Sequence, residues 1–321
     1  MRLLVLGGTS FVGRHLVQAA LDDGHAVTVF HRGRTNPDLF SQVERRLGDR
    51  STGNLEALRD GGWDATVDVS AYVPRHVEQA LAALDGREGH YVLVSSISAY
   101  DPAVATTHES SPTYAEPDPA TEQVTAQSYG PLKAACERQA IRSLAPQSPA
   151  IVRPTFVAGP HDPTDRFTYW ARVVSEGGPV PLAWPDVPVQ VIDARDLAAF
   201  MLRLATTASS GAFDAVGPFA PLRDMLTAMA PPDVEVDLVD VGPERLDAAG
   251  VTLPLVDGDP ASVPLMTRPG TAARGAGLTP RGFRDTARDT AAWDESRGRP
   301  PLRVGPSPAQ RAELLRGEVV S

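Results

Sequence analysis

Short apolar runs alternate along the first half of the chain with segments whose apolar residues recur at helical spacing. The runs are mainly apolar, and the first is apolar throughout, which is typical of strands buried on both faces of a sheet. They occupy residues 3–6, 26–30, 65–69, 90–94 and 150–154. Strands that alternate with helices favour a parallel sheet. The pattern predicts an α/β fold with a Rossmann-type, doubly wound parallel sheet.

The chain changes character after the last of these runs. Residues 156–188 are rich in Gly, Pro and polar side chains, which indicates a poor core and a segment that covers a substrate. We therefore expect a Rossmann domain over 1–155, with parts of 189–216 returning to it. A smaller C-terminal lobe, mainly substrate-binding, is expected over 156–300. Residues 301–321 are rich in Pro and Arg and are expected to form a tail.

A glycine-rich turn joins the first predicted strand to the helix that follows it. Its sequence is Gly7-Gly-Thr-Ser-Phe-Val-Gly13. In a strand–turn–helix–strand unit, such glycines allow a tight turn and a close approach of the backbone to a pyrophosphate at the helix N-terminus. Ser10 stands where this pattern has its middle glycine, so an ordinary glycine-rich turn is the alternative. The residues predicted to contact a dinucleotide here are Gly7, Thr9, Ser10, Phe11, Val12 and Gly13.

The residues after the second predicted strand indicate which dinucleotide is bound. An acidic residue at this place binds the ribose 2′-hydroxyl of NAD, whereas an arginine accommodates the 2′-phosphate of NADP. This chain has no acid there and instead has His31, Arg32 and Arg34. We therefore expect NADP in preference to NAD. The alternative is that these arginines are solvated surface charges.

Polar residues also follow the next predicted strands. Asp49 comes after a short third strand and is expected to accept a hydrogen bond from the adenine amino group. Ser70 and Ala71 end another apolar run, at the sheet edge where open α/β sheets bind ligands. Ser96 and Ser98 follow the next run, where a hydroxyl can bind a substrate oxygen. A serine-rich turn with satisfied hydroxyls is the alternative for the last two.

Tyr129 and Lys133 form the candidate catalytic pair. Residues four apart on a helix share one face, and a cation beside a phenol lowers the pKa of the Tyr from its usual value of about 10. Tyr129 then becomes a usable general acid or base near neutral pH. The chain has 30 Lys and Arg residues, of which Lys133 is the single Lys. A helix is expected to begin near Ser128 and to tolerate Pro131 in its first turn. A lysine left by chance on a solvated helix face is the alternative.

Composition excludes several classes of function. A net charge of −10 disfavours nucleic acid and anionic membrane surfaces as partners. The single cysteine, Cys136, excludes an intrachain disulfide and a Cys-based zinc site, and we expect it in the core. No spacing of His, Asp and Glu suggests a metal site. The first residues lack the long apolar region and cleavage site of a signal peptide, and the sequence has no run of 18 apolar residues, so we expect neither a leader nor a membrane span. We expect a cytoplasmic protein that acts on a small molecule as a monomer or homodimer.

In their order along the chain, these motifs resemble the short-chain dehydrogenase/reductase superfamily, in the extended or atypical branch that contains NAD(P)-dependent epimerase/dehydratase-like proteins. The resemblance rests on Gly7-Gly-Thr-Ser-Phe-Val-Gly13, Gly48-Asp-Arg50, Ser95-Ser-Ile-Ser-Ala-Tyr100, Tyr129-x-x-x-Lys133, Arg153-Pro154, Gly159-Pro160 and Ile192-Asp-Ala-Arg-Asp196. It implies that Tyr129 donates and accepts the proton. Lys133 would hold the nicotinamide ribose, Ser96 would be the catalytic hydroxyl, and Ser98 would touch substrate.

The resemblance leaves three functions open. The first is an NAD(P)-dependent oxidoreductase acting on a secondary alcohol or ketone of a sugar- or polyol-like molecule, with Arg166, Tyr169 and Arg195 binding the polar substrate. The second is an epimerase of a sugar, free or nucleotide-linked, whose cofactor is not consumed. The third is a non-catalytic cofactor-sensing or RNA-binding relative. The Tyr129 and Lys133 pair favours an enzyme, and the net charge disfavours RNA.

Overall fold

The computed structural model describes residues 1–103, 108–115, 117 and 121–316. The chain forms two compact units. Unit 1 comprises Met1–Thr155, Ala194–Val216 and Arg268–Thr279, and unit 2 comprises Phe156–Asp193, Gly217–Thr267 and Pro280–Ser321.

Unit 1 is built on a seven-stranded parallel sheet. Its strands are β1 (Arg2–Leu6), β2 (Ala26–His31), β3 (Glu44–Leu47), β4 (Ala65–Asp68), β5 (His90–Val94), β6 (Ala150–Pro154) and β10 (Gly211–Ala215). They lie in the order β10-β6-β5-β4-β1-β2-β3. Chain order reverses between β1 and β4, which is the topological switch point at which such sheets bind ligands. The predicted Rossmann-type fold is confirmed.

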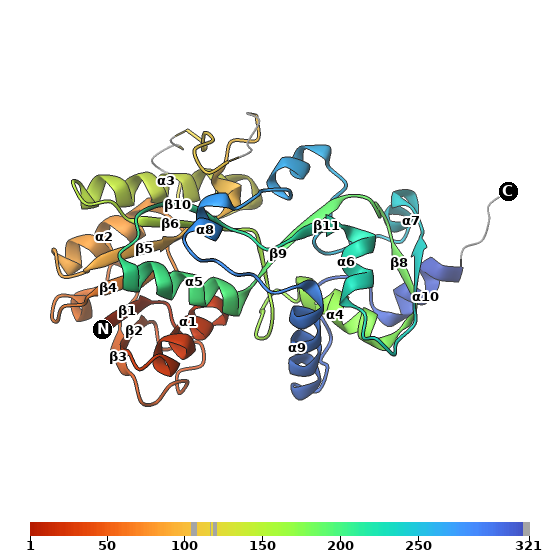
Figure 1. Ribbon diagram of the computed structural model, residues 1–321, viewed down its shortest axis with the longest axis horizontal. Coiled ribbons are helices and arrows are strands. Elements are labelled where there is room, and N and C mark those ends of the chain that lie inside the picture. The colour runs from red at the N-terminus through yellow and green to blue at the C-terminus, as the bar shows by residue number, and fades with distance from the viewer. Residues whose placement is uncertain (104–107, 116, 118–120, 317–321) are drawn as a thin grey trace. The chain divides into compact units, whose positions relative to one another are not determined.

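Helices cover both faces of this sheet. They are α1 (Phe11–Asp22), α2 (Pro74–Leu84), α3 (Ala126–Leu144), α5 (Ala194–Thr207) and α8 (Thr271–Gly275), with the short 3₁₀ turns η1 (Glu56–Leu58) and η2 (Ile97–Ala99). Figure 1 shows α2 and α3 on one face and α1 and α5 on the other. Cys136 of α3 lies in the apolar core that α3 forms with α2 and β5, where burial raises its pKa to about 12. It is a small core side chain, as expected.

The helix of the candidate catalytic pair begins earlier than expected. The helix α3 starts at Ala126, because Thr125 and Ser128 form a reciprocal capping box at its N-terminus. Pro131 therefore lies in the second turn, and its placement in the first turn was wrong. A proline there has no N–H to donate to the carbonyl of Gln127. The following residues Leu132 and Lys133 are nevertheless helical and buried.

Unit 2 has a core of its own. Its strands are β7 (Phe156–Ala158), β8 (Gly178–Leu182), β9 (Pro188–Asp193), β11 (Phe219–Pro221) and β12 (Val236–Asp240). Its helices are α4 (Arg166–Glu176), α6 (Leu222–Met229), α7 (Pro243–Ala248), α9 (Phe283–Ser296) and α10 (Pro308–Arg316), with the 3₁₀ turn η3 (Pro260–Leu265). The strands form two small sheets, β11-β9-β7 and β12-β8. The expected poor core over 156–188 was wrong, because Phe167 and Trp170 of α4 are buried in an extensive apolar cluster.

The boundaries of the units differ from the sequence expectation in three places. Residues 189–193 belong to unit 2, and the segment Arg268–Thr279 returns to unit 1. The expected tail at 301–321 contains α10, whose Leu314 is buried in the core of unit 2. Residues 317–321 of that tail lie outside the described residues. Among the described residues, no helix is both long and apolar enough to cross a membrane.

Candidate active site

The glycine-rich turn fits a phosphate group. A Cβ atom on Gly13 would lie 2.0 Å from the carbonyl oxygen of Gly7, so the first turn of α1 can approach β1 this closely only with glycine there. Gly7 has a φ of +94°, which favours glycine as well. Ser10, at the position of the expected middle glycine, has extended backbone that any residue adopts, and its side chain is exposed. The serine therefore leaves the N-terminus of α1 open to an anion.

The end of β2 presents arginine side chains to solvent. Arg32 is exposed, and Arg34 is 73% exposed with its Nη2 atom 3.7 Å from Asp49. His31 is buried, its Nδ1 accepts a hydrogen bond of 3.2 Å from the backbone N–H of Gly33, and burial lowers its pKa. The two exposed arginines, and not the buried imidazole, are the side chains of this turn that can reach a soluble anion.

Asp49 is held as a carboxylate acceptor at the end of β3. Its Oδ1 accepts hydrogen bonds from the backbone N–H of Ser51 at 2.9 Å and from the Ser51 hydroxyl at 2.6 Å. These bonds, followed by the nearby charges of Arg32 and Arg34, lower the pKa of Asp49. An ionised carboxylate at this place suits the predicted bond to an amino group.

A buried ion pair fixes the switch point, and sequence reasoning had not identified it as part of the site. The guanidinium of Arg50 binds both oxygens of Asp68 at 2.6 and 2.7 Å, at the end of β4. Asp68 accepts from the backbone N–H of Ser70 at 3.0 Å, and the Ser70 hydroxyl donates to the carbonyl of Leu6 at 3.0 Å. The pair therefore joins the carboxyl ends of β1 and β4, where Ser70 and Ala71 were predicted to meet a cofactor.

The single lysine lies at the same edge of the sheet. The Nζ atom of Lys133 donates to the carbonyl of Ala71 at 2.8 Å and to that of Val94 at 2.7 Å, after β4 and at the end of β5. Lys133 is only 4% exposed, and burial lowers its pKa. Tyr129 lies one turn earlier on α3 and is half-buried. The amine is therefore not on a solvated helix face, which removes the alternative interpretation.

Tyr72 is a neighbour of this amine that the predicted site residues did not include. Its ring centroid lies 5.4 Å from the Nζ atom of Lys133, within the range of a cation–π contact. The side chain is 46% exposed, although it is a large aromatic residue. Its position directly after Ala71 was the available signal, because residues at the carboxyl ends of these strands face the ligand crevice.

The serines after β5 have different surroundings. Ser96 is buried, and its Oγ accepts a hydrogen bond of 3.1 Å from the backbone N–H of Ser98, which caps η2. Ser95 instead donates to Glu137 of α3 at 2.5 Å. The hydroxyl proton of Ser96 remains for another acceptor, since the described bond uses only its lone pair. This is compatible with the predicted role of Ser96 toward a substrate oxygen.

A second buried ionic network holds α3 against the sheet. Arg153 of β6 binds the two oxygens of Glu137 at 2.8 and 2.6 Å and donates to the hydroxyl of Tyr100 at 2.8 Å. Tyr100 in turn donates to Asp214 of β10 at 2.7 Å. Arg268 pairs with the same Asp214 and stacks on the Tyr100 ring at 3.7 Å. This network fixes the helix that bears Tyr129 and Lys133.

The three predicted substrate-binding side chains do not form one group. Arg166 is half-buried at the start of α4 and lines a cavity in unit 2. The prediction that Tyr169 contacts substrate was wrong, because the side chain is 1% exposed and its ring packs against Trp170 in the core of unit 2. Arg195 is half-buried on α5 and belongs to unit 1.

His76 of α2 makes the stability of unit 1 sensitive to acid. Burial, then the charges of Arg50 and Arg75, lowers its pKa from 6.5 to about 4, although Asp68 and Glu122 oppose this. Because the unfolded chain binds the proton first, stability falls as pH decreases from about 6.5 to about 4. We expect His76→Gln to remove roughly 1–3 kcal/mol of this loss.

Urea unfolding at pH 7 and pH 4.5 measures this effect. His108→Gln, which changes an exposed histidine, is the matched control and should leave the acid-induced loss unchanged. An equal loss in wild type and His76→Gln would remove His76 as its cause.

One curated relative is similar to part of the chain. The chloroplast stem-loop binding protein of 41 kDa b from Arabidopsis thaliana is 29% identical over 114 residues. The match spans 31% of this chain and 30% of the length of that protein. What that protein binds therefore does not transfer to this chain through the match.

Solved structures with the same fold span nearly the whole chain. A putative epimerase from Burkholderia cenocepacia J2315 has 22% identity and a TM-score of 0.66, over 91% of this chain and 98% of its own. WbmH from Bordetella bronchiseptica, in complex with NAD⁺, has 16% identity and a TM-score of 0.64, over 92% of this chain and 99% of its own. RMD from Pseudomonas aeruginosa, complexed with NADPH, has 19% identity and a TM-score of 0.63, over 92% of this chain and 99% of its own.

The family itself is shown by sequence. The model of the NAD dependent epimerase/dehydratase family matches residues 3–215, a range that contains the glycine-rich turn, Ser96, Tyr129 and Lys133. The chain therefore belongs to the NAD-dependent epimerase/dehydratase family and is an NAD(P)-dependent enzyme of the short-chain dehydrogenase/reductase type.

Proposed function

We propose that the protein is an NAD(P)-dependent oxidoreductase that moves a hydride to or from a secondary alcohol or ketone carbon of a sugar- or polyol-like small molecule. The observation that supports this most is the position of the Lys133 amine, bound to the carbonyls of Ala71 and Val94 and one helical turn from Tyr129. An ammonium buried at the ligand-binding edge of the sheet favours a phenolate over a phenol.

The turn after β1 fits a dinucleotide. The close approach at Gly13 and the exposed N-terminus of α1 suit a pyrophosphate, and the exposed Arg32 and Arg34 suit a 2′-phosphate. Asp49, Ser70 and Ala71 would hold the remainder of the cofactor, with Lys133 at the nicotinamide ribose. When bound, a nicotinamide dinucleotide supplies the hydride acceptor or donor.

The residues of the chain then transfer the proton and bind the substrate oxygen. In the reductive direction Tyr129 donates its phenolic proton to the oxygen that gains charge, and Lys133 stabilises the phenolate that forms. Ser96 donates a hydrogen bond to the same oxygen and keeps its proton, which stabilises the charge where it develops. In the oxidative direction Tyr129 accepts the proton. The buried pairs of Arg50 and Arg153 keep these groups in place.

An epimerase of a sugar, free or nucleotide-linked, is the second candidate, and the description of the Burkholderia protein as a putative epimerase favours it. The two reactions differ in whether cofactor is consumed. The test is to release and quantify dinucleotide from purified protein, then to follow NADPH oxidation with a panel of ketones. Net oxidation by protein purified without dinucleotide supports the oxidoreductase. Stoichiometric, tightly held NAD with no net turnover would support the epimerase instead.

Arg32→Ala tests the preference for NADP. We expect it to raise the dissociation constant for NADPH roughly tenfold or more, because a charge-assisted bond to phosphate is lost, while NADH changes less than about twofold. Isothermal titration calorimetry with each dinucleotide measures both constants. Arg59→Ala removes an exposed arginine on the same unit and should change neither. Equal weakening of NADPH and NADH by Arg32→Ala would contradict the assignment of a 2′-phosphate contact.

A further inference from the structure

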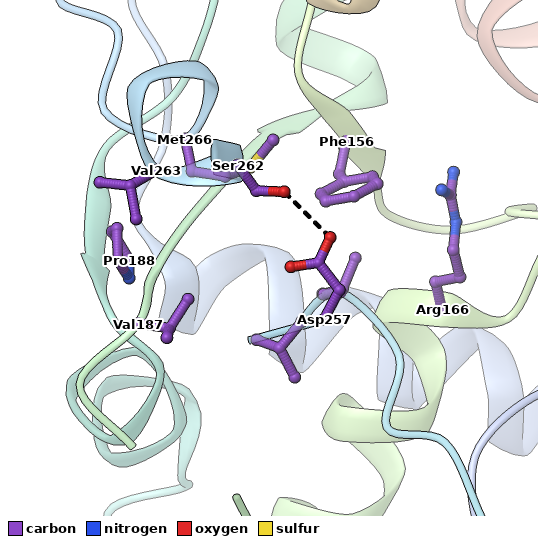
Figure 2. Close-up of a pocket in the computed structure, with 10 residues that line it drawn as sticks. Phe156, Arg166, Val187, Pro188, Asp257, Ser262, Val263 and Met266 are labelled. Carbon is purple, nitrogen blue, oxygen red and sulfur yellow. Dashed lines mark hydrogen bonds between the residues drawn. The ribbon is translucent and has the colours of Figure 1, made fainter. Parts of the chain in front are cut away.

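Unit 2 contains a cavity of about 170 Å³ that the predicted catalytic residues do not explain. It is lined by Phe156, Arg166, Val187, Pro188, Leu255, Val256, Asp257, Ser262, Val263 and Met266. Most of these side chains are apolar, and Figure 2 shows Val187, Pro188 and Val263 gathered on the side away from Arg166. A dry cavity of about 150 Å³ lined by such side chains holds one benzene ring. The space therefore suits a phenyl-sized group.

Arg166 provides a cation at this cavity that forms no ion pair within the described part of the chain, although its charge acts on the buried carboxylate of Asp162. Its Nε atom donates to the Thr164 hydroxyl at 3.1 Å, and its guanidinium lies over the Phe156 ring at 4.8 Å. These contacts leave both terminal nitrogens unused, and no carboxylate of the described residues lies within 4.0 Å of them. A half-buried guanidinium that is held in place in this way is suited to bind an oxyanion.

The carboxylate of the cavity, in contrast, is already bound. Asp257 accepts from the backbone N–H of Asp259 at 3.0 Å and from the Ser262 hydroxyl at 3.0 Å, one bond to each oxygen. In Figure 2 the Phe156 ring lies between this pair and Arg166. Both oxygens of Asp257 therefore already have a donor, whereas the terminal nitrogens of Arg166 do not have a carboxylate partner among the described residues.

We propose that this cavity binds a small monoanion, with a phenyl- or branched-alkyl-sized group against the apolar wall and a carboxylate on Arg166. The inference goes beyond the proposed function, because the site holds a ligand other than the proposed sugar- or polyol-like substrate. One cation beside an apolar space of this size matches an apolar monoanion better than a neutral polyol.

The experiment measures binding to the full-length protein without cofactor or turnover, so its outcome is independent of the assignment of Tyr129. Calorimetric titrations use 3-phenylpropionate, 3-phenylpropan-1-ol and 3-phenylpropylamine, which share one apolar body and differ in charge. We expect the acid to bind roughly tenfold or more tightly than the alcohol, and the amine to bind weakest. Arg166→Gln should abolish the difference between acid and alcohol, whereas Arg288→Gln, on exposed Arg288, should preserve it.

A second variant tests the apolar part of the cavity. Val263→Phe fills the space and should weaken the acid and the alcohol alike, by roughly tenfold. If Arg166→Gln does not fold, the proposal is tested by the binding of the three probes to wild type and to Val263→Phe. Equal binding of acid and alcohol to wild type, tightest binding of the amine, or tighter binding of uridine monophosphate than of the acid would each overturn the proposal.

Discussion

Tyr129→Phe should reduce turnover roughly 10³-fold, within the range of 10²–10⁴ that a general acid or base contributes. The variant keeps the aromatic ring on α3 and loses only the hydroxyl that exchanges the proton. Because Lys133 is held by the carbonyls of Ala71 and Val94, its position should not change. Cofactor binding should therefore remain within a few-fold of wild type. Steady-state kinetics with the best ketone of the panel, together with calorimetry for the dinucleotide, measures the two effects separately.

Tyr169→Phe is the matched control for this variant. It removes a phenolic hydroxyl that is buried in the core of unit 2 and has no hydrogen-bond partner among the described residues. Removing an unsatisfied buried hydroxyl costs little stability and can increase it. Turnover should stay at the wild-type level. If Tyr129→Phe retained turnover, the acid–base assignment would be wrong, and if Tyr169→Phe lost turnover, its exclusion from the site would be wrong.

The order of strands and helices in unit 1 could be predicted because the signals for it are local. The apolar runs that form β1, β4 and β5 are buried on both faces, and a continuous apolar run is the direct signature of such a strand. The glycine turn and the Tyr129 and Lys133 pair are also local patterns. Their shared location at one edge of the sheet follows from parallel strand order.

The buried charges could not be predicted, because each depends on a partner distant in sequence. Arg50 and Asp68 are 18 residues apart, and Arg268 and Asp214 are 54 apart. A lone Arg or Asp in a sequence predicts a solvated position, since such groups are seldom buried without a partner. The prediction for Tyr169 was wrong for a related reason. Its polar surroundings in the sequence indicated a surface, whereas the helical spacing of α4 directs its ring into the core.

The largest effect on stability is expected from Arg268→Met. Both Arg268 and Asp214 have fully buried side chains, and the Arg268 guanidinium also stacks on the Tyr100 ring. Removing one partner leaves an uncompensated carboxylate in the interior, which costs about 3–5 kcal/mol. The pair also attaches the segment Arg268–Thr279 to β10, although this segment is far from the rest of unit 1 in sequence. Urea unfolding at pH 7, followed by circular dichroism, measures the change in the free energy of unfolding.

Two further variants decide whether this loss comes from an isolated charge. Arg274→Met changes an exposed arginine of the same segment and should cost less than about 0.5 kcal/mol. The double variant Arg268→Met, Asp214→Leu should recover much of the loss, since an apolar pair replaces the ion pair. Burial already raises the pKa of Asp214 against the effect of Arg268, so without Arg268 the carboxyl gains protons more readily. The loss in Arg268→Met should therefore be smaller at pH 5 than at pH 7, and an equal loss at both would show that packing, and not charge, is responsible.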